Sequence, residues 1–559
     1  MSLSDLNLPS LADKTISEKN PDTRRRLATS LRERGIVNAT LPRDGLVQRT
    51  ARYHRRQLLV RAAVVGVILL LTVRAAEYVG YAALAIGFPF GLDYGEGIVW
   101  QQALLIPGSH MYGDITQFPY IVFNYTPLYH LVVRSITAFG IDPLAAGRGV
   151  TLAATIAISG LAGLIVTTAM RESTSTSARI AGAAVAGLMV FTYGSLQAWA
   201  TLMRVDMLAI CLTIAGVYLA IQAGKKTIIS CFAILLFALA IYTKQTELSA
   251  PIAGILVMLI VNARSTLMAS TLGFLVGGSA LVVLQLRTGG AFWHHIFVYN
   301  LNGPFSFYEA LHKMWWSMKD DGLGVLLGVV ALAFLWWSEV TSLPTLKPTA
   351  WIKAIRGSIQ LRALAILSLW FLLASLQLVS LGKSGAAVNY CIEWMCITTM
   401  PIGMATSLAW DRAAIQGNIV RFAGWAGLLL SLTIAAHTLR RPVVGQAIVG
   451  DSNEIALRTH LVNLIRENPK PSLSTDMTLL MRAGQAVPLE PTMFTDLTVS
   501  GIWDQGPFIN LIRDRAFGLI ITEKWYEEPF TNEIMRAIES NYPLMEQLGD
   551  YRVRRPSHF

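Results

Sequence analysis

Two carboxylates stand close together in the segment GLDYGEG at residues 91–97, directly after a long apolar stretch. They are Asp93 and Glu96. A carboxylate in this position can accept a proton from a hydroxyl group or orient that hydroxyl. The alternative role of Asp93 is that of a turn residue, because Asp before Tyr-Gly favours a turn. Glu96 can instead cap a helix that we expect to start near Gly97, where the helix dipole favours a negative charge.

Charged and hydrogen-bonding side chains also recur at the ends of three later apolar segments. These residues are Arg204, Asp206, Lys244, Gln245, Lys383, Asn389, Tyr390 and Glu393. The cations among them could hold an anion such as a phosphate, and Lys244 is the stronger candidate. Cations and a carboxylate at one membrane face suit the cleavage of a sugar–phosphate bond on a lipid carrier. The cations would hold the leaving phosphate, and the carboxylate would take the proton of the incoming hydroxyl.

Each of these residues also has a purely structural interpretation. Arg204 and Asp206 can form an ion pair at the start of a helix, and the stem of Lys244 can extend along the membrane interface. The last group, from Lys383 to Glu393, either lines a groove for the carrier lipid or closes a loop. Adjacent histidines such as His294 and His295 point in different directions, so the sequence predicts no metal site and no cofactor.

The composition places the chain among membrane proteins. Of its 559 residues, 53% are hydrophobic and only 14% are charged, whereas soluble proteins carry about 25% charged residues. The net charge of +11 is explained by topology signals and by attraction to anionic membrane lipid, and we expect no nucleic-acid partner. The four cysteines lie in or beside apolar segments, where they act as small core residues.

Apolar segments of membrane-spanning length recur along the sequence, and we expect about eleven transmembrane helices. The candidate spans lie near 58–80, 145–170, 180–197, 205–223, 227–243, 247–262, 266–286, 322–338, 362–381, 391–410 and 421–438. The segment 127–139 is apolar but short, so we interpret it as an interfacial or re-entrant helix. The predicted fold class is therefore a polytopic α-helical membrane protein.

Basic residues in the loops predict the orientation of these spans. Residues 1–56 are polar and Arg-rich, which indicates a flexible cytoplasmic arm, and 57–439 form the membrane domain. The first outward loop, 81–144, then carries Asp93 and Glu96. Residues 440–559 follow an odd number of crossings and should lie outside. Expected helices at 453–466 and 531–539 and expected strands at 517–522 and 551–555 predict a small α/β domain there.

Several short motifs resemble the GT-C class of membrane glycosyltransferases, which includes the protein O-mannosyltransferases and the lipid A aminoarabinose transferases. They are the acidic motif at 93–96, YTPLYH at 125–130, Gly147-Arg148, Arg204-Val205-Asp206, Thr243-Lys244-Gln245 and the region of Asn389-Tyr390. The stretch SLSTDMTLLMRAGQ, with FGLIIT and YRVRRP, is similar to the soluble domain of bacterial relatives. This resemblance implies a polyprenyl- or dolichyl-phosphate sugar donor, an inverting displacement, no nucleotide-sugar site, and Asp93 as the base.

One departure from the pattern concerns the acceptor. Relatives that mannosylate proteins carry adjacent Asp and Glu, whereas Tyr94 and Gly95 separate the two acids here. The acceptor hydroxyl can therefore belong to a glycan, a lipid or a protein, and either acid can be the base.

The resulting prediction is a transferase that moves a single sugar at the outer face of the bacterial inner membrane. Asp93 would deprotonate the acceptor, Glu96 would assist, and Lys244 with Arg204 would stabilise the leaving phosphate. The alternative is a transporter or flippase of lipid-linked sugars. Transporters often contain inverted repeats with sites near the midplane, and no repeat is visible in this sequence. A non-catalytic scaffold is a further alternative.

Overall fold

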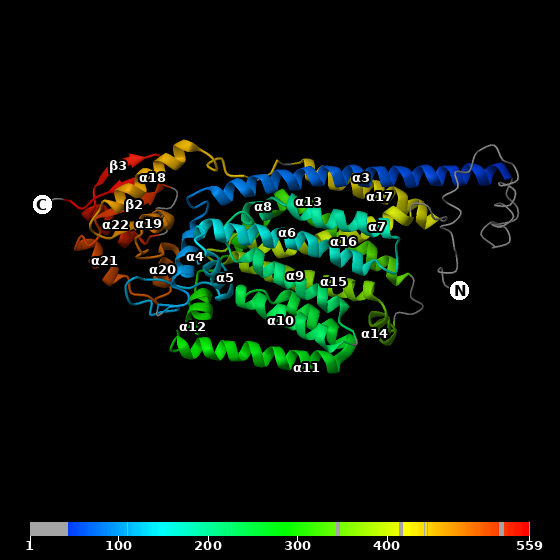
Figure 1. Cartoon of the computed structure of the whole chain (residues 1–559), viewed down its shortest axis with the longest axis horizontal. Helices are drawn as coiled ribbons and strands as arrows, with labels where there is room; N and C mark the ends of the chain where they lie inside the picture. Colours follow the sequence, from blue (N-terminus) through cyan, green and yellow to red (C-terminus); the bar gives the residue numbers. More distant parts are fainter. Residues whose placement is uncertain are drawn as a thin grey trace.

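The computed structural model describes residues 43–557, except 109, 225, 342–346, 413–417, 441, 444 and 525–529. Most of the predicted cytoplasmic arm, residues 1–42, lies outside this range. Helix α3 (Arg43–Gly87) contains the rest of that arm, so the helix begins before the span expected at 58–80 and continues past it. Figure 1 shows α3 along one side of the molecule.

Long helices form the main body of the molecule and run side by side along its longest axis (Figure 1). After α3 they are α6 (Pro143–Ala169), α7 (Thr176–Met189), α9 (Asp206–Gln222), α10 (Thr227–Thr243), α11 (Ser249–Arg287), α13 (Phe307–Val340), α15 (Ile359–Gln377), α16 (Ile392–Arg412) and α17 (Asn418–Leu439). A helix suits an apolar segment in lipid because it satisfies its own backbone hydrogen bonds.

Five helices of the described chain are long and apolar enough to cross a membrane. They cover Arg55–Gly87, Pro143–Ala169, Ser249–Arg287, Phe307–Val340 and Ile359–Gly382. Shorter apolar helices cover much of the other expected spans, so the total of eleven stays a prediction. The spans expected at 247–262 and 266–286 are the two parts of α11, which Asn262 divides with a non-helical φ of −155° and ψ of 91°.

Small residues allow some of these helices to pack closely. A Cβ atom on Gly182 of α7 would lie 2.3 Å from the carbonyl oxygen of Gly403 in α16. A Cβ atom on Gly187 would lie 2.7 Å from the carbonyl oxygen of Ser159 in α6. Helix α6, which carries Arg148, is therefore part of a tightly packed group of helices.

Short elements fill the end of the bundle at which α3 finishes. They include α4 (Tyr94–Leu105), α5 (Leu128–Thr137), α8 (Gly194–Trp199), α12 (Ala291–Trp293) and η3 (His294–Tyr299). Helix α5 has ten residues, or about 15 Å at 1.5 Å per residue, against about 30 Å of bilayer hydrocarbon. The segment 127–139 thus forms a short helix, as the interfacial or re-entrant interpretation requires.

The C-terminal segment contains a four-stranded sheet in the order β1-β2-β4-β3. Its strands are β1 (Ser472–Ser474), β2 (Leu519–Glu523), β3 (Leu544–Leu548) and β4 (Tyr551–Arg554). Strand β1 pairs in parallel with β2, with Leu473 opposite Ile520, and the other pairs are antiparallel. Both expected strands correspond to strands of this sheet, β2 and β4. Residues 519–521 are fully buried, as expected for a strand covered on both faces.

Helices pack around this sheet at one end of the bundle, next to α4 (Figure 1). They are α18 (Ser452–Arg466), α19 (Met477–Ala483), α20 (Pro491–Val499), α21 (Gly506–Arg513) and α22 (Asn532–Asn541). The helices expected at 453–466 and 531–539 correspond to α18 and α22.

An ion pair between Asp142 and Arg482 joins the C-terminal segment to the start of α6. Asp142 caps α6 by accepting hydrogen bonds from the N–H groups of Leu144 and Ala145. Burial opposes the ionisation of Asp142. The hydrogen bond and the positive charge of Arg482 act against burial, and so do the two N–H groups. Together they outweigh burial and hold the pKa of Asp142 below its ordinary value.

Because this pKa is lower in the folded protein, ionised Asp142 stabilises the fold above the unfolded-state pKa of about 3.9. The contribution is lost as the pH falls through the folded-state pKa. We expect Asp142→Asn to lower the thermal midpoint at pH 7 and to have a smaller effect at pH 3. Thermal unfolding of the detergent-solubilised protein at both pH values measures this difference, and an equal loss at both would contradict it.

Candidate active site

The acidic motif forms the turn between α3 and α4. Asp93 is the N-cap of α4, and its Oδ1 accepts a hydrogen bond of 2.9 Å from the N–H of Gly95. Helix α4 therefore begins at Tyr94 and not near Gly97, and the capping role expected for Glu96 belongs to Asp93. Asp93 is therefore a turn residue, because its side chain binds the backbone N–H of Gly95.

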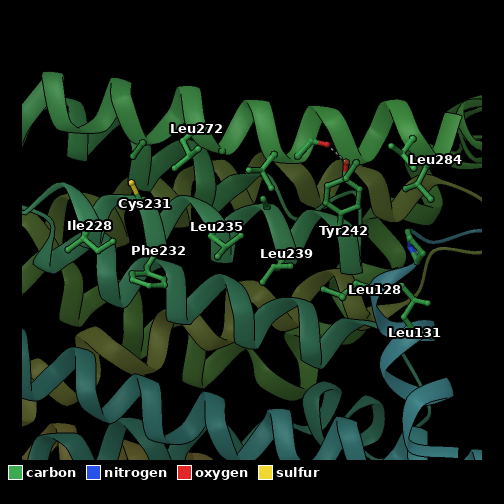
Figure 2. A pocket seen from close by; sticks show the side chains of 18 residues that line it. Leu128, Leu131, Ile228, Cys231, Phe232, Leu235, Leu239, Tyr242, Leu272 and Leu284 are labelled. Carbon is green, nitrogen blue, oxygen red and sulfur yellow. Dashed lines mark hydrogen bonds between the residues drawn. The ribbon is translucent and has the colours of Figure 1, made fainter. Parts of the chain in front are cut away.

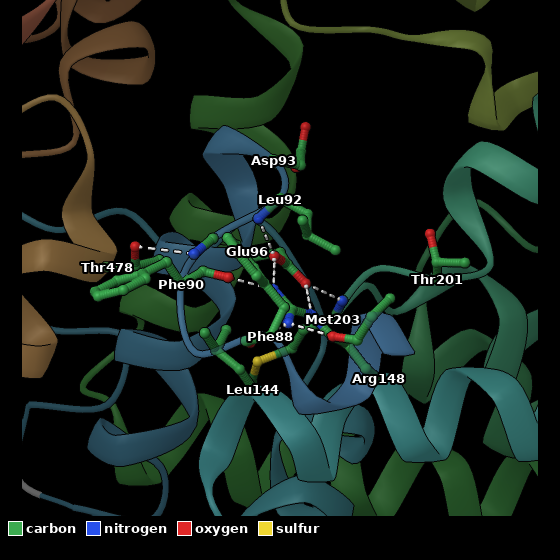
Figure 3. Close-up of polar contacts among 12 residues, drawn as sticks. Phe88, Phe90, Leu92, Asp93, Glu96, Leu144, Arg148, Thr201, Met203 and Thr478 are labelled. Atoms are coloured by element: carbon green, nitrogen blue, oxygen red, sulfur yellow. Dashed lines mark hydrogen bonds and ion pairs between the residues drawn. The ribbon is translucent and has the colours of Figure 1, made fainter. Parts of the chain in front are cut away.

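Asp93 also forms an ion pair through Oδ1 with Arg204, which lies in the loop between α8 and α9. Among the described residues, Oδ2 of Asp93 has no hydrogen-bond partner. The side chain is 23% exposed, and Figure 3 shows it pointing away from Glu96. A Cβ atom on Gly95 would lie within about 2 Å of the guanidinium of Arg204, so a larger residue there would displace that guanidinium. One carboxylate oxygen is thus held in place while the other is free to accept a proton.

Glu96 lies in a different environment, fully buried below the turn. Its Oε1 accepts hydrogen bonds from Arg148 Nε at 2.9 Å and from the N–H of Met203 at 2.7 Å. Its Oε2 accepts from Arg148 Nη2 and from the N–H of Leu92, both at 2.7 Å. Four donors occupy the lone pairs of this carboxylate. This geometry argues against the direct assistance expected of Glu96, and we assign it a positioning role.

Arg148 is the partner that makes this burial possible. Its Nη1 donates 2.7 Å hydrogen bonds to the carbonyls of Ala85 and Phe88, and its Nη2 donates at 2.6 Å to the carbonyl of Phe90. The guanidinium therefore fixes the end of α3 and the loop that leads to Asp93 (Figure 3). The sequence reasoning named Arg148 only within a motif. Its position inside an apolar helix was a signal, since such a charge needs a partner.

Asp206 and Lys244 form a second charged cluster. Lys244 Nζ lies 2.8 Å from Asp206 Oδ1, which also accepts a 2.9 Å hydrogen bond from Asn389 Nδ2. Asp206 Oδ2 accepts a 2.8 Å hydrogen bond from the indole N–H of Trp199. The expected pairing of Arg204 with Asp206 is therefore wrong. Asp206 pairs with Lys244, because the start of α9 and the end of α10 lie next to each other.

Trp199, which the sequence reasoning missed, connects the two clusters. The guanidinium of Arg204 lies 5.0 Å from the centre of the Trp199 ring, whose indole N–H binds Asp206. The sequence could have indicated Trp199, because it is an aromatic residue five positions before Arg204.

The two cations differ in how fully their charge is neutralised. Lys244 Nζ contacts Asp206 and lies 3.8 Å from Glu247 and 5.0 Å from the centre of the Tyr390 ring. Its side chain is 6% exposed, against 11% for Arg204. Arg204 has one carboxylate partner, and its buried Nε has no partner among the described residues. Arg204 is therefore better placed than Lys244 to hold an anion, which reverses the order expected from the sequence.

The remaining candidates are distributed around this centre. Gln245 Nε2 donates to the carbonyl of Asn124 at 2.9 Å. Glu393 is buried in the first turn of α16, where its carboxylate accepts a hydrogen bond from the indole of Trp370.

Lys383 does not join the other cations. Its backbone pairs with Phe305, and its side chain lies near Asp496 of the C-terminal segment. Burial lowers the pKa of Lys383, while the nearby Asp496 acts in the opposite direction. The three cations proposed to hold one phosphate therefore do not converge on one point.

His295 packs together the loops that contain Gly113 and Phe123. Its Nδ1 accepts a 3.0 Å hydrogen bond from the N–H of Phe123, and its Nε2 lies 2.8 Å from the carbonyl of Gly113. Within the part of the chain that the structure describes, no three His, Cys, Asp or Glu side chains are arranged to hold a metal.

An apolar cavity of about 540 Å³ lies between α10, α11 and α5. Leucine and phenylalanine side chains such as Leu235 and Phe232 line it along the length of α10 (Figure 2). Pro127 and Leu128 line one end, two to three residues after Tyr125. Burial raises the pKa of the Tyr125 hydroxyl, and the positive charge of Arg204 nearby acts in the opposite sense. The cavity therefore ends beside the charged clusters.

The sequence matches none of the protein-family models and none of the curated proteins to which it was compared. Its fold is similar to that of ArnT from Cupriavidus metallidurans bound to undecaprenyl phosphate. That match has a TM-score of 0.51 at 11% identity and covers 87% of this chain and 97% of ArnT. For the apo state of the same ArnT, the TM-score is 0.50 at 13% identity, over 88% of this chain and 98% of ArnT.

The chain has the GT-C fold. The oligosaccharyltransferase AglB from Archaeoglobus fulgidus, in complex with an inhibitory peptide and a dolichol-phosphate, matches with a TM-score of 0.48 at 10% identity. That match covers 87% of this chain and 74% of AglB. The loop after α3 and the loop before α9 carry the Asp93–Arg204 pair, so two of the motifs behind the expected resemblance lie together at the candidate site.

Proposed function

We propose that the protein transfers a single sugar from a polyprenyl-phosphate donor to a hydroxyl group of a glycan, lipid or protein acceptor. The observation that carries this proposal is the arrangement of Asp93. Gly95 and Arg204 hold its Oδ1, while Oδ2 is free to accept a proton among the described residues. A fixed base beside a cation is what an inverting displacement at a sugar phosphate requires.

The reaction proceeds in one displacement. Asp93 Oδ2 takes the proton from the acceptor hydroxyl as its oxygen forms a bond to the anomeric carbon of the sugar. The bond from that carbon to the phosphate oxygen breaks, and the electron pair leaves with the phosphate. Arg204 stabilises the negative charge on the leaving phosphate. Lys244 contributes less, because Asp206 and Glu247 already balance its charge.

The apolar cavity supports the choice of a lipid-linked donor. Its lining along α10 suits an isoprenoid chain, and one end of the cavity lies beside Tyr125 and the charged clusters. A donor bound there would place its chain between α10 and α11 and its phosphate near Arg204. The structurally similar ArnT was crystallised with undecaprenyl phosphate, a carrier of this class. The proposed site lies at the outer face of the bacterial inner membrane.

Transport of lipid-linked sugars is less well supported. Transporter sites lie near the bilayer midplane between discontinuous helices. Here Asp93 and Arg204 lie in loops at the ends of the long apolar helices. Counterflow of a labelled lipid-linked sugar in vesicles would favour transport instead.

Mass analysis of envelope glycolipids and glycoproteins tests the proposal without a prior choice of acceptor. A strain that lacks the gene is compared with the same strain expressing the wild-type protein. We expect one sugar mass to be missing in the first strain and restored in the second. Identical masses in both strains would overturn the proposal, and loss of a whole oligosaccharide would replace single-sugar transfer with transfer of an assembled glycan.

Arg204→Lys should lower kcat by about 10- to 100-fold, because lysine keeps the charge but loses a charge-assisted hydrogen bond. The measurement is transfer from a defined polyprenyl-phosphate sugar by the variant at matched membrane levels. Arg134→Lys is the matched control, since Arg134 is exposed on α5 away from the charged clusters. Equal kcat and KM for the Arg204→Lys protein and the wild type would contradict the role of Arg204.

A further inference from the structure

The C-terminal segment binds the backbone of the turn that carries Asp93. The hydroxyl of Thr478 accepts a 3.1 Å hydrogen bond from the N–H of Gly91, and Arg458 Nη1 donates to the carbonyl of Gly91 at 2.8 Å. Figure 3 shows Thr478 reaching this turn from the side opposite Arg148. Both backbone groups of Gly91, two residues before Asp93, are therefore bound by residues almost four hundred positions later in the chain.

Two further hydrogen bonds extend this contact along the turn. Gln446 Nε2 donates to the carbonyl of Leu92 at 2.8 Å, and the hydroxyl of Tyr94 donates to Glu490 Oε1 at 2.5 Å. The residues on both sides of Asp93 are thus held by the C-terminal segment. Glu490 caps α20 through the N–H groups of Thr492 and Met493, so its carboxylate is fixed at the start of a helix.

The glycines of the turn allow this close approach. A Cβ atom on Gly91 would lie 2.9 Å from Cγ2 of Thr478, and one on Gly97 would lie 2.6 Å from Cβ of Met477. Real Cβ atoms essentially never approach other atoms so closely. The backbone of the turn therefore packs directly against the side chains of Met477 and Thr478 at the start of α19.

Asp476 orients the hydroxyl of Thr478. Its Oδ1 accepts hydrogen bonds from the hydroxyl of Thr478 at 2.6 Å and from the N–H of Thr478 at 3.0 Å. A hydroxyl has one hydrogen and two lone pairs, so the lone pairs of Thr478 face Gly91 once its hydrogen is bound to Asp476. Asp476 Oδ2 accepts a 3.2 Å hydrogen bond from the hydroxyl of Tyr551 in β4. The sheet of the C-terminal segment is therefore connected to the turn through two side chains.

We infer that Thr478 is a positioning residue for the transfer reaction, and that the C-terminal segment holds Asp93 in its reactive orientation. Thr478 and Arg458 fix the turn from the outer side, and Glu96 with Arg148 fixes it from the membrane side. The side chain of Asp93 bonds to neither group, so its orientation depends on Arg204 and on the backbone that both groups hold. This inference rests on the proposed function, because it assigns a role in that reaction.

Replacing Thr478 with valine tests the inference with little change of volume. The variant loses the acceptor for the N–H of Gly91. We expect kcat to fall about tenfold, which is the equivalent of one hydrogen bond, and KM for the donor to stay unchanged. Thr478→Ser keeps the hydroxyl and should retain most of the activity. Thr498→Val is the matched control, because the hydroxyl of Thr498 bonds only within α20. All proteins are full-length and compared at equal membrane levels.

A double-variant test checks the contact between Gly91 and Thr478 directly. Gly91→Ala should lower kcat, because the new methyl group meets Cγ2 of Thr478. Combining it with Thr478→Ser removes Cγ2 and should recover much of the lost activity. Recovery of both kcat and the thermal midpoint in the double variant supports the contact and its catalytic effect.

The outcomes distinguish this inference from the proposed function. A wild-type kcat in the Thr478→Val protein would overturn the positioning role. So would an equal loss of kcat by Gly91→Ala with Thr478 and with Ser at position 478. In either case the proposed function stands if the wild-type protein transfers sugar. A rise in KM for the donor without a change in kcat would also overturn the positioning role, because that result indicates a role in donor binding. A wild-type protein that transfers no sugar would overturn the proposed function and, with it, the catalytic role of Thr478.

Discussion

Replacing Asp93 with asparagine should lower the rate of sugar transfer by about 10²- to 10⁴-fold, the usual cost of removing a well-placed base. Asparagine is a good N-cap, so α4 should still begin at Tyr94. The amide cannot take a proton from the acceptor hydroxyl, and it removes the charge that faces Arg204. Transfer from a polyprenyl-phosphate sugar is measured with membranes that contain equal amounts of each protein.

Asp142→Asn is a matched control for this experiment. Asp142 is also an N-cap aspartate that is paired with an arginine, but it lies at the start of α6 and binds Arg482. We expect Asp142→Asn to keep transfer activity at neutral pH. Full activity of the Asp93→Asn protein at normal membrane levels would show that Asp93 is only a turn residue.

Replacing Arg148 with methionine should destabilise the protein by about 3–5 kcal/mol, the typical cost of leaving a buried charge without its partner. The variant leaves Glu96 buried with two of its four hydrogen bonds and frees the carbonyls of Ala85, Phe88 and Phe90. The free energy of unfolding is measured by denaturant titration of the protein in detergent.

The double variant Glu96→Met with Arg148→Met should recover much of this loss, because removing both charges leaves none uncompensated. Its transfer activity should stay low, because Glu96 no longer binds the N–H groups of Leu92 and Met203. These two residues directly precede Asp93 and Arg204. Arg74→Met is the control, because the Arg74–Glu77 pair is more accessible, with side chains 18% and 47% exposed, and should contribute about 0–1 kcal/mol. Similar losses for Arg148→Met and Arg74→Met would contradict the importance of the buried pair.

The sequence by itself determined the helices of the membrane part and the outline of the C-terminal segment. Apolar length indicated the positions of α6, α9 and α10, and the short run at 127–139 indicated the short helix α5. Helical periodicity located α18, and the segments FGLIIT and YRVRR indicated β2 and β4. These features depend on local composition and on the need of a backbone in lipid to bond within its own segment. They can therefore be derived without knowing which segments meet.

Only the tertiary structure decided which charges pair and which stay accessible. Arg204 has a nearby acid two residues away, Asp206, but pairs with Asp93, 111 positions earlier. Lys244, which the sequence made the stronger candidate for holding an anion, takes Asp206 instead. Asp93 and Glu96 are three residues apart, yet one is partly exposed and the other is enclosed by Arg148. Partner choice follows from how α4, α6, α9 and the C-terminal segment pack, and packing of distant segments leaves no periodic signal in the sequence.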